Sequence, residues 1–146
     1  MSDPENHCRH LDTVFSKAHI NTRLYPSAKL KTGEGTAEIT LEIADSYHHG
    51  MHAVHGSVYF KLLDDAAYFA ANSAVTDVFL VTTSFHIHML RPVHKGTLYA
   101  KGTLRMKSRS LLIADAEIHD ENGKEVAYGT GHFAKSRIPI DSADEN

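Results

Sequence analysis

The fold of this chain is decided by the stretch His55-Gly-Ser-Val-Tyr-Phe-Lys-Leu-Leu-Asp-Asp-Ala66, which continues in mainly small and apolar residues to Val75. Residues 58–75 hold almost no turn former and are rich in Ala, Leu and Phe, so we expect one helix here. Apolar side chains cover most of the circumference of this helix, which indicates deep burial. Ser57 lies just before it, where a hydroxyl can cap free N–H groups.

Strand-like segments surround this helix. An alternating segment precedes it, with Ala37, Ile39, Leu41 and Ile43 on one side, and four more follow at 80–90, 97–107, 110–119 and 124–135. A short helix is expected over 4–20. This order predicts an α+β fold in which a curled antiparallel sheet of about five strands wraps the central helix. We expect an N-terminal helical segment (1–22), one main domain (23–138) and a polar C-terminal tail (139–146), of which 141–146 are disordered.

Composition excludes several classes of protein. The chain has 146 residues with 42% apolar and 23% charged side chains, which suits one globular domain. No apolar run approaches the roughly 18 residues that cross a bilayer. With 15 Lys and Arg against 18 Asp and Glu, we expect no nucleic-acid partner. Cys8 alone cannot close an internal disulfide and the opening residues resemble no secretory signal, so we expect a cytoplasmic protein.

Two consecutive aspartates lie on the predicted helix. On a helical wheel, Asp65 shares a narrow polar arc with Lys61 and Tyr68, which predicts a solvated rim residue in a weak surface pair. Asp64 lies about 100° away, among apolar neighbours. A carboxylate there costs free energy unless it is paired, protonated or used, and burial raises its pKa, which makes it a better base. The alternative is a buried Asp that bonds to a backbone amide or a nearby His.

The start of the helix adds a second chemical feature. A helix N-terminus presents free N–H groups and a partial positive charge, and Gly56 lets another molecule approach the backbone. An oxygen that becomes negative during acyl transfer would be stabilised there. Residues 56 and 64 are about 12 Å apart along a helix axis. If both act on one carbon, two copies of the chain must supply them, which indicates an isologous dimer with shared sites.

The run from His55 to Ala66 resembles the HGG-x6-D-x-A motif of hotdog-fold acyl-CoA thioesterases, specifically the phenylacetate-pathway (PaaI-like) type. The resemblance covers about residues 25–136 and includes the Arg91-Pro92 turn, the Lys107-Ser108-Arg109 turn and the hairpin at 120–123. It implies the hotdog fold and hydrolysis of an acyl-CoA thioester to the free acid and CoA. It also implies a homodimer that assembles into a homotetramer. CoA is then part of the substrate, and no separate cofactor is expected.

The same resemblance implies roles for residues of the site. The carboxylate of Asp64 is the general base or the nucleophile, the Gly56 amide donates to the thioester oxygen, and His55 supports that loop. Thr82 falls on a Ser or Thr position that helps hold the attacking water. Two positions depart from the family pattern: His49 stands where an Asn is frequent, and Ser57 replaces the second glycine of the motif.

The substrate would contact two further groups of residues. By the resemblance, the nucleotide of CoA binds at Arg91, Lys107, Ser108 and Arg109, for which solvated turns are the alternative. Basic groups suit phosphate by charge, and Arg also by its bidentate geometry. We expect the acyl chain in an apolar channel between subunits, lined by Phe60, Tyr68 and Phe69.

Twelve histidines suggest an alternative chemistry. His48, His49, His52 and His55 lie within eight residues, and His86 and His88 share one face of a strand, as ligands of zinc or nickel could. No Cys or paired carboxylate completes a familiar ligand motif, so we expect no metal, and we assign His119 to the ordinary surface. A His-metal hydrolase and a non-hydrolytic acyl-CoA binding or sensing protein remain the alternatives.

Overall fold

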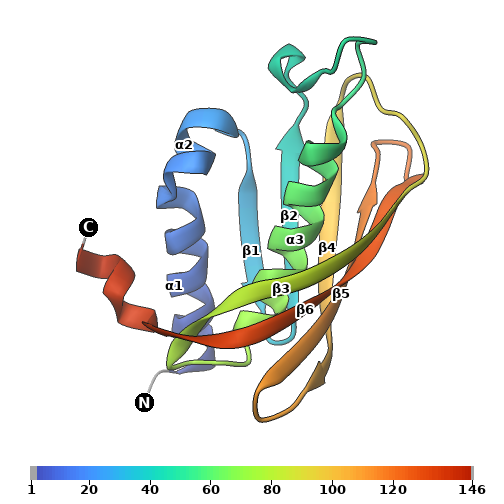
Figure 1. Cartoon of the computed structure of the whole chain (residues 1–146). Helices are drawn as coiled ribbons and strands as arrows, with labels where there is room; N and C mark the ends of the chain where they lie inside the picture. The colour runs from blue at the N-terminus through green and yellow to red at the C-terminus, as the bar shows by residue number, and fades with distance from the viewer. Residues whose placement is uncertain (1–2, 146) are drawn as a thin grey trace.

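The computed structural model describes residues 3–145, so the terminal residues Met1, Ser2 and Asn146 of the predicted end segments lie outside the described part. Within it, a six-stranded antiparallel sheet of order β1-β2-β4-β5-β6-β3 curls around helix α3 (Figure 1). The helices are α1 (Pro4–Lys17), α2 (His19–Leu24) and α3 (Gly56–Asn72), with short 3-10 helices η1 (Asp45–Tyr47) and η2 (Ile140–Glu145). The strands are β1 (Lys29–Gly33), β2 (Thr36–Glu42), β3 (Val78–Met89), β4 (Thr97–Lys107), β5 (Leu111–His119) and β6 (Glu125–Pro139). The predicted α+β architecture is confirmed.

Helix α3 lies in direct contact with the sheet. Leu63 and Ala66 are fully buried, and β4 passes so close that a Cβ on Gly102 would lie 2.0 Å from the Ala66 carbonyl oxygen. The helix ends earlier than predicted because Asn72 turns its buried amide back on the chain. Asn72 Nδ2 donates to the carbonyls of Val75 and Val78, and Oδ1 accepts from Leu80 N–H, which fixes the connection into β3.

Towards both ends of the described residues the structure adds detail that the sequence did not predict. The expected helix over 4–20 is two helices, because Ala18 adopts an extended conformation between α1 and α2. Strand β1 was not predicted, and it pairs with β2 in the register Lys29↔Thr40. At the C-terminal end, where the sequence predicted no helix or strand, Ile140–Glu145 form η2, which begins with a hydrogen bond from Ile140 N–H to Asp77 O.

Strand β3 forms one edge of the sheet. Within residues 3–145 it pairs only with β6, in the register Phe85↔Gly131 and Ile87↔Gly129, so its other edge has no strand partner there. Its apolar side chains Val81 and Met89 are 44% and 52% exposed. A long edge strand with exposed apolar side chains is a surface on which another strand can pair.

Helix α1 lies alongside β1 and flanks α3 on one side (Figure 1). Leu11 and Phe15 of α1 are buried, and the Phe15 ring meets the Phe69 ring of α3 edge-on at 5.7 Å. Among the described residues no helix is both long enough and apolar enough to cross a membrane.

Candidate active site

The connection before α3 is held together by its own histidines. The His48 ring lies 2.7 Å from the His94 carbonyl oxygen, and the His94 ring lies 2.9 Å from the His52 carbonyl oxygen. His49 Nδ1 accepts from the Met51 N–H, so the half-buried His49 stabilises a turn within its own loop. In the part of the chain that the structure describes, these histidines form no group of three potential metal ligands.

His55 is the N-cap of α3. Its Nδ1 accepts from the Ser57 N–H at 3.0 Å and lies 2.8 Å from the Ser57 hydroxyl, while its own N–H donates to the Tyr47 carbonyl. The capping side chain is therefore His55, whereas the sequence predicted Ser57. The cap uses the Ser57 N–H, and the preceding Gly56 N–H has no acceptor among the described residues. It is a free donor at the positive end of a helix.

Asp64 lies two turns further along α3 and is half-buried. Thr82 of β3 donates its hydroxyl hydrogen to Asp64 Oδ1 at 2.8 Å, so the structure brings these two predicted residues together. Burial raises the pKa of Asp64; the Thr82 hydrogen bond opposes that rise, and the neighbouring Asp65 carboxylate adds to it. Oδ2 of Asp64 accepts no hydrogen bond within the described chain, so it can accept a proton from a reactant.

Asp65 is not the solvated rim residue that the sequence predicted. It forms an ion pair with Lys61, and their side chains are only 23% and 11% exposed. The Lys61 ammonium lies 5.4 Å from the ring centre of Phe15 and 5.1 Å from that of Tyr25. Burial raises the pKa of Asp65, and Lys61 opposes that rise. The helical wheel missed this environment because α1 and the chain after α2 cover the polar arc.

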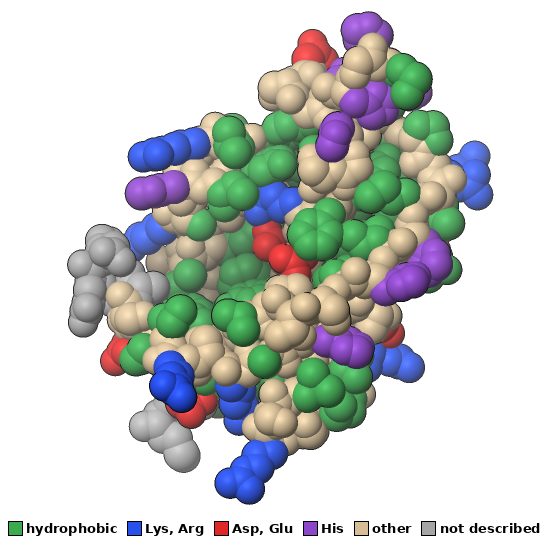
Figure 2. Space-filling model, in the orientation of Figure 1, with side chains coloured by type: hydrophobic (Ala, Val, Ile, Leu, Met, Phe, Trp, Pro, Cys, Tyr) green, Lys and Arg blue, Asp and Glu red, His purple; other side chains and the backbone are tan. Residues whose placement is uncertain are grey.

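On the face of the molecule shown in Figure 2, acidic side chains lie in the middle, beside a basic side chain and with hydrophobic side chains around them. Gly56 and Asp64 stand on one uninterrupted helix, eight residues apart, which is about 12 Å along its axis. A single chain therefore offers an activated carboxylate and an amide donor that are too far apart to act on one carbonyl group.

Residues 51–127, more than half of the chain, match the family described as the thioesterase superfamily. The chain belongs to the thioesterase superfamily. Its matched segment contains both Gly56 and Asp64 and extends through β5.

Solved structures of thioesterase-superfamily type share this hotdog fold. The Escherichia coli PaaI protein of the phenylacetic acid degradation operon superposes with a TM-score of 0.83 at 22% identity, over 94% of this chain and 99% of that one. A hypothetical thioesterase of Streptococcus pneumoniae, solved with coenzyme A, gives 0.72 at 20% identity, over 77% and 88%. A Saccharolobus solfataricus protein whose name assigns it provisionally to the esterases is 21% identical, over 96% of this chain and 98% of its own length.

Aromatic residues of this thioesterase-superfamily chain divide between the surface and the core. Phe60 is 39% exposed and meets Phe85 of β3 edge-on at 5.8 Å. Tyr68 is half-buried and donates its hydroxyl hydrogen to the Leu80 carbonyl, and burial raises its pKa. Phe69 is only 7% exposed and packs on Phe15, so within this chain it belongs to the core, and the channel expected between subunits stays a prediction. It faces α1, a helix whose position the helical wheel could not include.

The predicted CoA-binding residues lie at opposite ends of α3. The Arg91 carbonyl accepts from the Tyr59 hydroxyl near the start of the helix, whereas Lys107 Nζ donates to the Ala74 carbonyl just beyond its end. Ser108 closes the β4–β5 turn by hydrogen bonds with Leu111, and Arg109 is exposed beside it. Since the 17 residues of α3 span about 25 Å, one chain does not gather these side chains around one phosphate.

A hollow that the sequence did not indicate opens beside the helix start. It has a volume of about 420 Å³, and Tyr25, Tyr47, His55, Ser57 and Val58 are among the residues that line it. Tyr25 and Tyr47 contact each other with ring centres 5.1 Å apart, so one wall is aromatic. Tyr25 directly follows α2 and Tyr47 ends the three-residue helix η1, and such short segments give no periodic signal.

Proposed function

We propose that this protein hydrolyses acyl-CoA thioesters to the free acid and CoA, and that each site is shared by two subunits of a homodimer. One observation carries the proposal: a half-buried carboxylate, Asp64, with one free oxygen, lies on the same helix as the free N–H of Gly56. The first is a base or nucleophile and the second is an oxyanion donor, as acyl transfer requires.

The chemistry follows from these two groups. Asp64 takes a proton from water while the hydroxide attacks the thioester carbon. The Gly56 N–H and the helix end stabilise the oxyanion. When the C–S bond breaks, the thiolate receives the proton that Asp64 holds, so the products are the acid and the free thiol. In the second route Asp64 attacks the carbonyl carbon directly and the C–S bond breaks, so that the CoA thiolate leaves and an anhydride forms. Water then hydrolyses the anhydride to the free acid and the Asp64 carboxylate, and its second proton goes to the thiolate.

The edge strand β3 supplies a geometry for the shared site. Its residue Thr82 contacts Asp64, and at its other end the Met89 side chain lies where a Cβ on Gly56 would be only 2.9 Å away. If two copies pair antiparallel along β3 with the two-fold axis at His86, Phe85 lies opposite the partner's Ile87. Because Thr83 is the extra residue of a β-bulge, Thr82 then lies opposite the partner's Met89. Directly opposed residues of antiparallel strands point to the same side. The partner subunit's Gly56 then faces Asp64.

Other features are compatible with this proposal. We propose CoA as the acyl carrier because the streptococcal thioesterase was solved with coenzyme A.

A further pairing of dimers into a tetramer remains part of the proposal. Cys8 is buried and unpaired, which suits a reducing cytoplasm.

Release of CoA from a panel of short, long and aromatic acyl-CoAs tests the function. We expect turnover by the wild type, a loss of about a hundredfold or more in Asp64→Asn, and wild-type rates in Asp77→Asn, which changes an exposed aspartate outside the site. Unchanged turnover in Asp64→Asn would remove the catalytic assignment. Binding of acyl-CoAs without turnover by the wild type would favour the sensing protein instead. Loss of turnover with a chelator, restored by added metal, would favour the metal hydrolase.

A further inference from the structure

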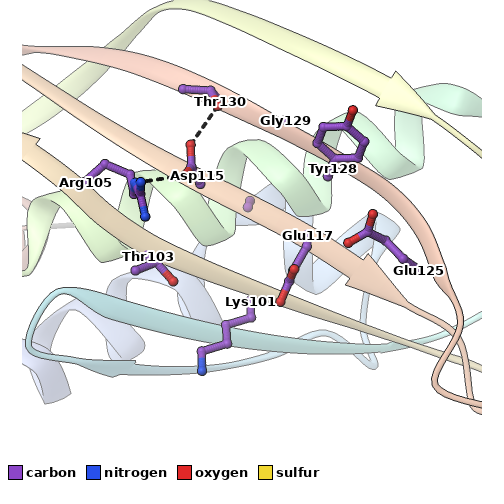
Figure 3. A pocket seen from close by; sticks show the side chains of 10 residues that line it. Lys101, Thr103, Arg105, Asp115, Glu117, Glu125, Tyr128, Gly129 and Thr130 are labelled. Carbon is purple, nitrogen blue, oxygen red and sulfur yellow. Dashed lines mark hydrogen bonds and ion pairs between the residues drawn. The ribbon is translucent and has the colours of Figure 1, made fainter.

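The face of the sheet opposite α3 carries a hollow of about 430 Å³ between β4, β5 and β6 (Figure 3). In its middle the charges are satisfied: Arg105 pairs with Asp115 at 3.2 Å, and the Thr130 hydroxyl donates to Asp115 at 2.7 Å. At the end near the β5–β6 hairpin, Glu117 and Glu125 have carboxylates that form no hydrogen bond or ion pair with any described residue.

A β-bulge brings these two acids to the same face. The β5–β6 register runs Ile118↔Ala127 and then His119↔Glu125, so Val126 is the extra residue. Val126 and Ala127 are consecutive and both fully buried, which breaks the alternation of the strand. In a regular register Val126 would oppose His119. The bulge instead places Glu125 across from His119, and Glu117 lies two residues before His119 on the same face of β5.

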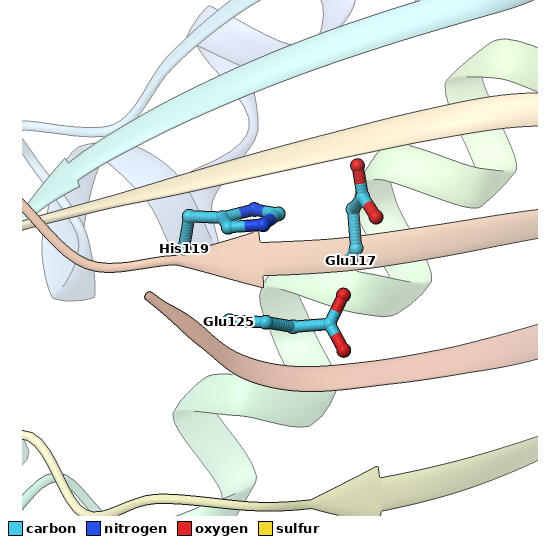
Figure 4. A group of neighbouring side chains, drawn as sticks. All are labelled: Glu117, His119 and Glu125. Carbon is cyan, nitrogen blue, oxygen red and sulfur yellow. The ribbon is translucent and has the colours of Figure 1, made fainter. Parts of the chain in front are cut away.

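The three side chains form a donor set for a cation. One ligand atom each from Glu117, His119 and Glu125 lies within 4.8 Å of the others (Figure 4). Two carboxylates at this separation repel each other unless a positive charge compensates them. Lys101 is the strand neighbour of Glu117, but the two form no ion pair, and in Figure 3 its ammonium points away. Arg105, the other basic residue that lines the hollow, is paired with Asp115 and so does not neutralise Glu117 and Glu125.

We propose that Glu117, His119 and Glu125 bind one divalent transition-metal ion of the zinc class. Ligand atoms of one tetrahedral zinc ion lie about 3.4 Å apart at bond lengths of about 2.1 Å. Small side-chain rotations would bring the three ligand atoms to that spacing. An imidazole nitrogen beside two carboxylates favours zinc, cobalt, nickel or manganese over calcium and magnesium, which take oxygen ligands. Three protein ligands leave a coordination position for water. The ion would join β5 to β6 beside their hairpin.

The proposal is tested by calorimetric titration of zinc into the chelator-treated full-length protein. We expect one zinc equivalent that is bound at least tenfold more weakly in Glu117→Gln, Glu125→Gln and His119→Gln. Glu38→Gln is the matched control, since Glu38 is an exposed acid of β2 outside the cluster. His52→Asn controls for the histidine-rich loop; His52 has a φ of 64°, a conformation that Asn tolerates.

Thermal unfolding separates loss of binding from loss of fold. Without metal, Glu117→Gln and Glu125→Gln should unfold no lower than the wild type, because each substitution relieves a repulsion. With zinc, only proteins with all three ligands should gain stability. Equal zinc affinity in the wild type and the two glutamate variants would overturn the proposal. Loss of the zinc equivalent in His52→Asn, with binding retained in Glu117→Gln, would also overturn it by assigning the ion to the loop.

Discussion

Asp64 and Asp65 are adjacent in sequence but differ in what compensates their charge. The Asp65 carboxylate is paired with the Lys61 ammonium under two aromatic rings. The Asp64 carboxylate has a single hydroxyl donor and one unsatisfied oxygen. The sequence predicted the environment of Asp64 correctly, because the wheel placed it among apolar neighbours of its own helix. The prediction for Asp65 was wrong because its neighbours come from other segments of the chain, which the periodicity of α3 cannot reveal.

The raised pKa of Asp64 predicts a stability cost at neutral pH. Its folded-state pKa lies above the unfolded value, so its contribution is most favourable below the unfolded pKa and is lost as the pH rises through the folded pKa. Asp64→Asn should therefore unfold at a higher temperature than the wild type at pH 7, by roughly 2–4 °C for about 1 kcal/mol. The difference should shrink below about pH 4, where the carboxyl is protonated in both states.

Thermal unfolding at the two pH values checks this prediction, with Asp77→Asn as the control. A lower melting temperature in Asp64→Asn at pH 7 would mean that its carboxylate stabilises the fold.

Removal of the Thr82 hydroxyl should shift the pH dependence of hydrolysis. The Thr82 hydrogen bond lowers the pKa of Asp64, so Thr82→Val should raise that pKa further. Because the ionised carboxylate is the active form, the acid limb of kcat/KM should move to higher pH. The measurement is a pH–rate profile of the wild type, Thr82→Val and Thr82→Ser. Thr82→Ser should keep the wild-type limb, and an unmoved limb in Thr82→Val would contradict the role of this hydrogen bond.

At the scale of elements, the helices and strands with strong periodicity were predicted and those without it were not. Helix α3 and strands β3 to β6 were located from their apolar patterns, with errors of a few residues at their ends. Strand β1 was missed because its five residues are mostly polar or exposed. The bulge opposite His119 was also missed, because it depends on pairing between strands.

The contact between α3 and β4 depends on the absence of a side chain at Gly102. A Cβ there would lie 2.0 Å from the Ala66 carbonyl oxygen and 2.8 Å from the Ala67 nitrogen, which are backbone atoms that cannot rotate away. We expect Gly102→Ala to lower the unfolding free energy by about 3 kcal/mol or more. Gly50→Ala is the control, since its Cβ meets no atom within 4 Å. Chemical denaturation measures both, and equal stability of the two variants would exclude close approach as the reason for this glycine.

The cap of α3 gives a prediction that separates stability from chemistry. His55→Ala removes the acceptor for the Ser57 N–H and should cost about 1 kcal/mol, whereas His55→Asn should retain most of the stability because Asn is a good N-cap. The measurement is denaturant unfolding together with kcat for acyl-CoA hydrolysis. If the cap also orients the Gly56 N–H, kcat should follow stability across the two variants. An unchanged kcat in His55→Ala would restrict His55 to a structural role.

At the scale of the whole molecule, the shared site makes a prediction that one chain could not satisfy. Asp64→Asn and Gly56→Val should each be inactive as homodimers. A mixed dimer of the two variants contains one site with an intact Asp64 from one chain and an intact Gly56 from the other. We therefore expect subunit exchange to restore activity, up to one site in each mixed dimer. Hydrolysis assays on mixed and unmixed variants measure it, and no recovery in verified mixed dimers would contradict the sharing.

The order of the strands has a consequence for how the molecule is made. Thr82 lies on β3, yet the strand that holds β3 in the sheet is β6, which starts at Glu125 and is the last strand within residues 3–145. During synthesis α3 emerges with Asp64 long before β6 exists, so β3 has no strand partner in its own chain until β6 has been translated. Such distant pairing forms late because a long loop must close first. We therefore expect the nascent chain to be inactive until β6 has paired with β3.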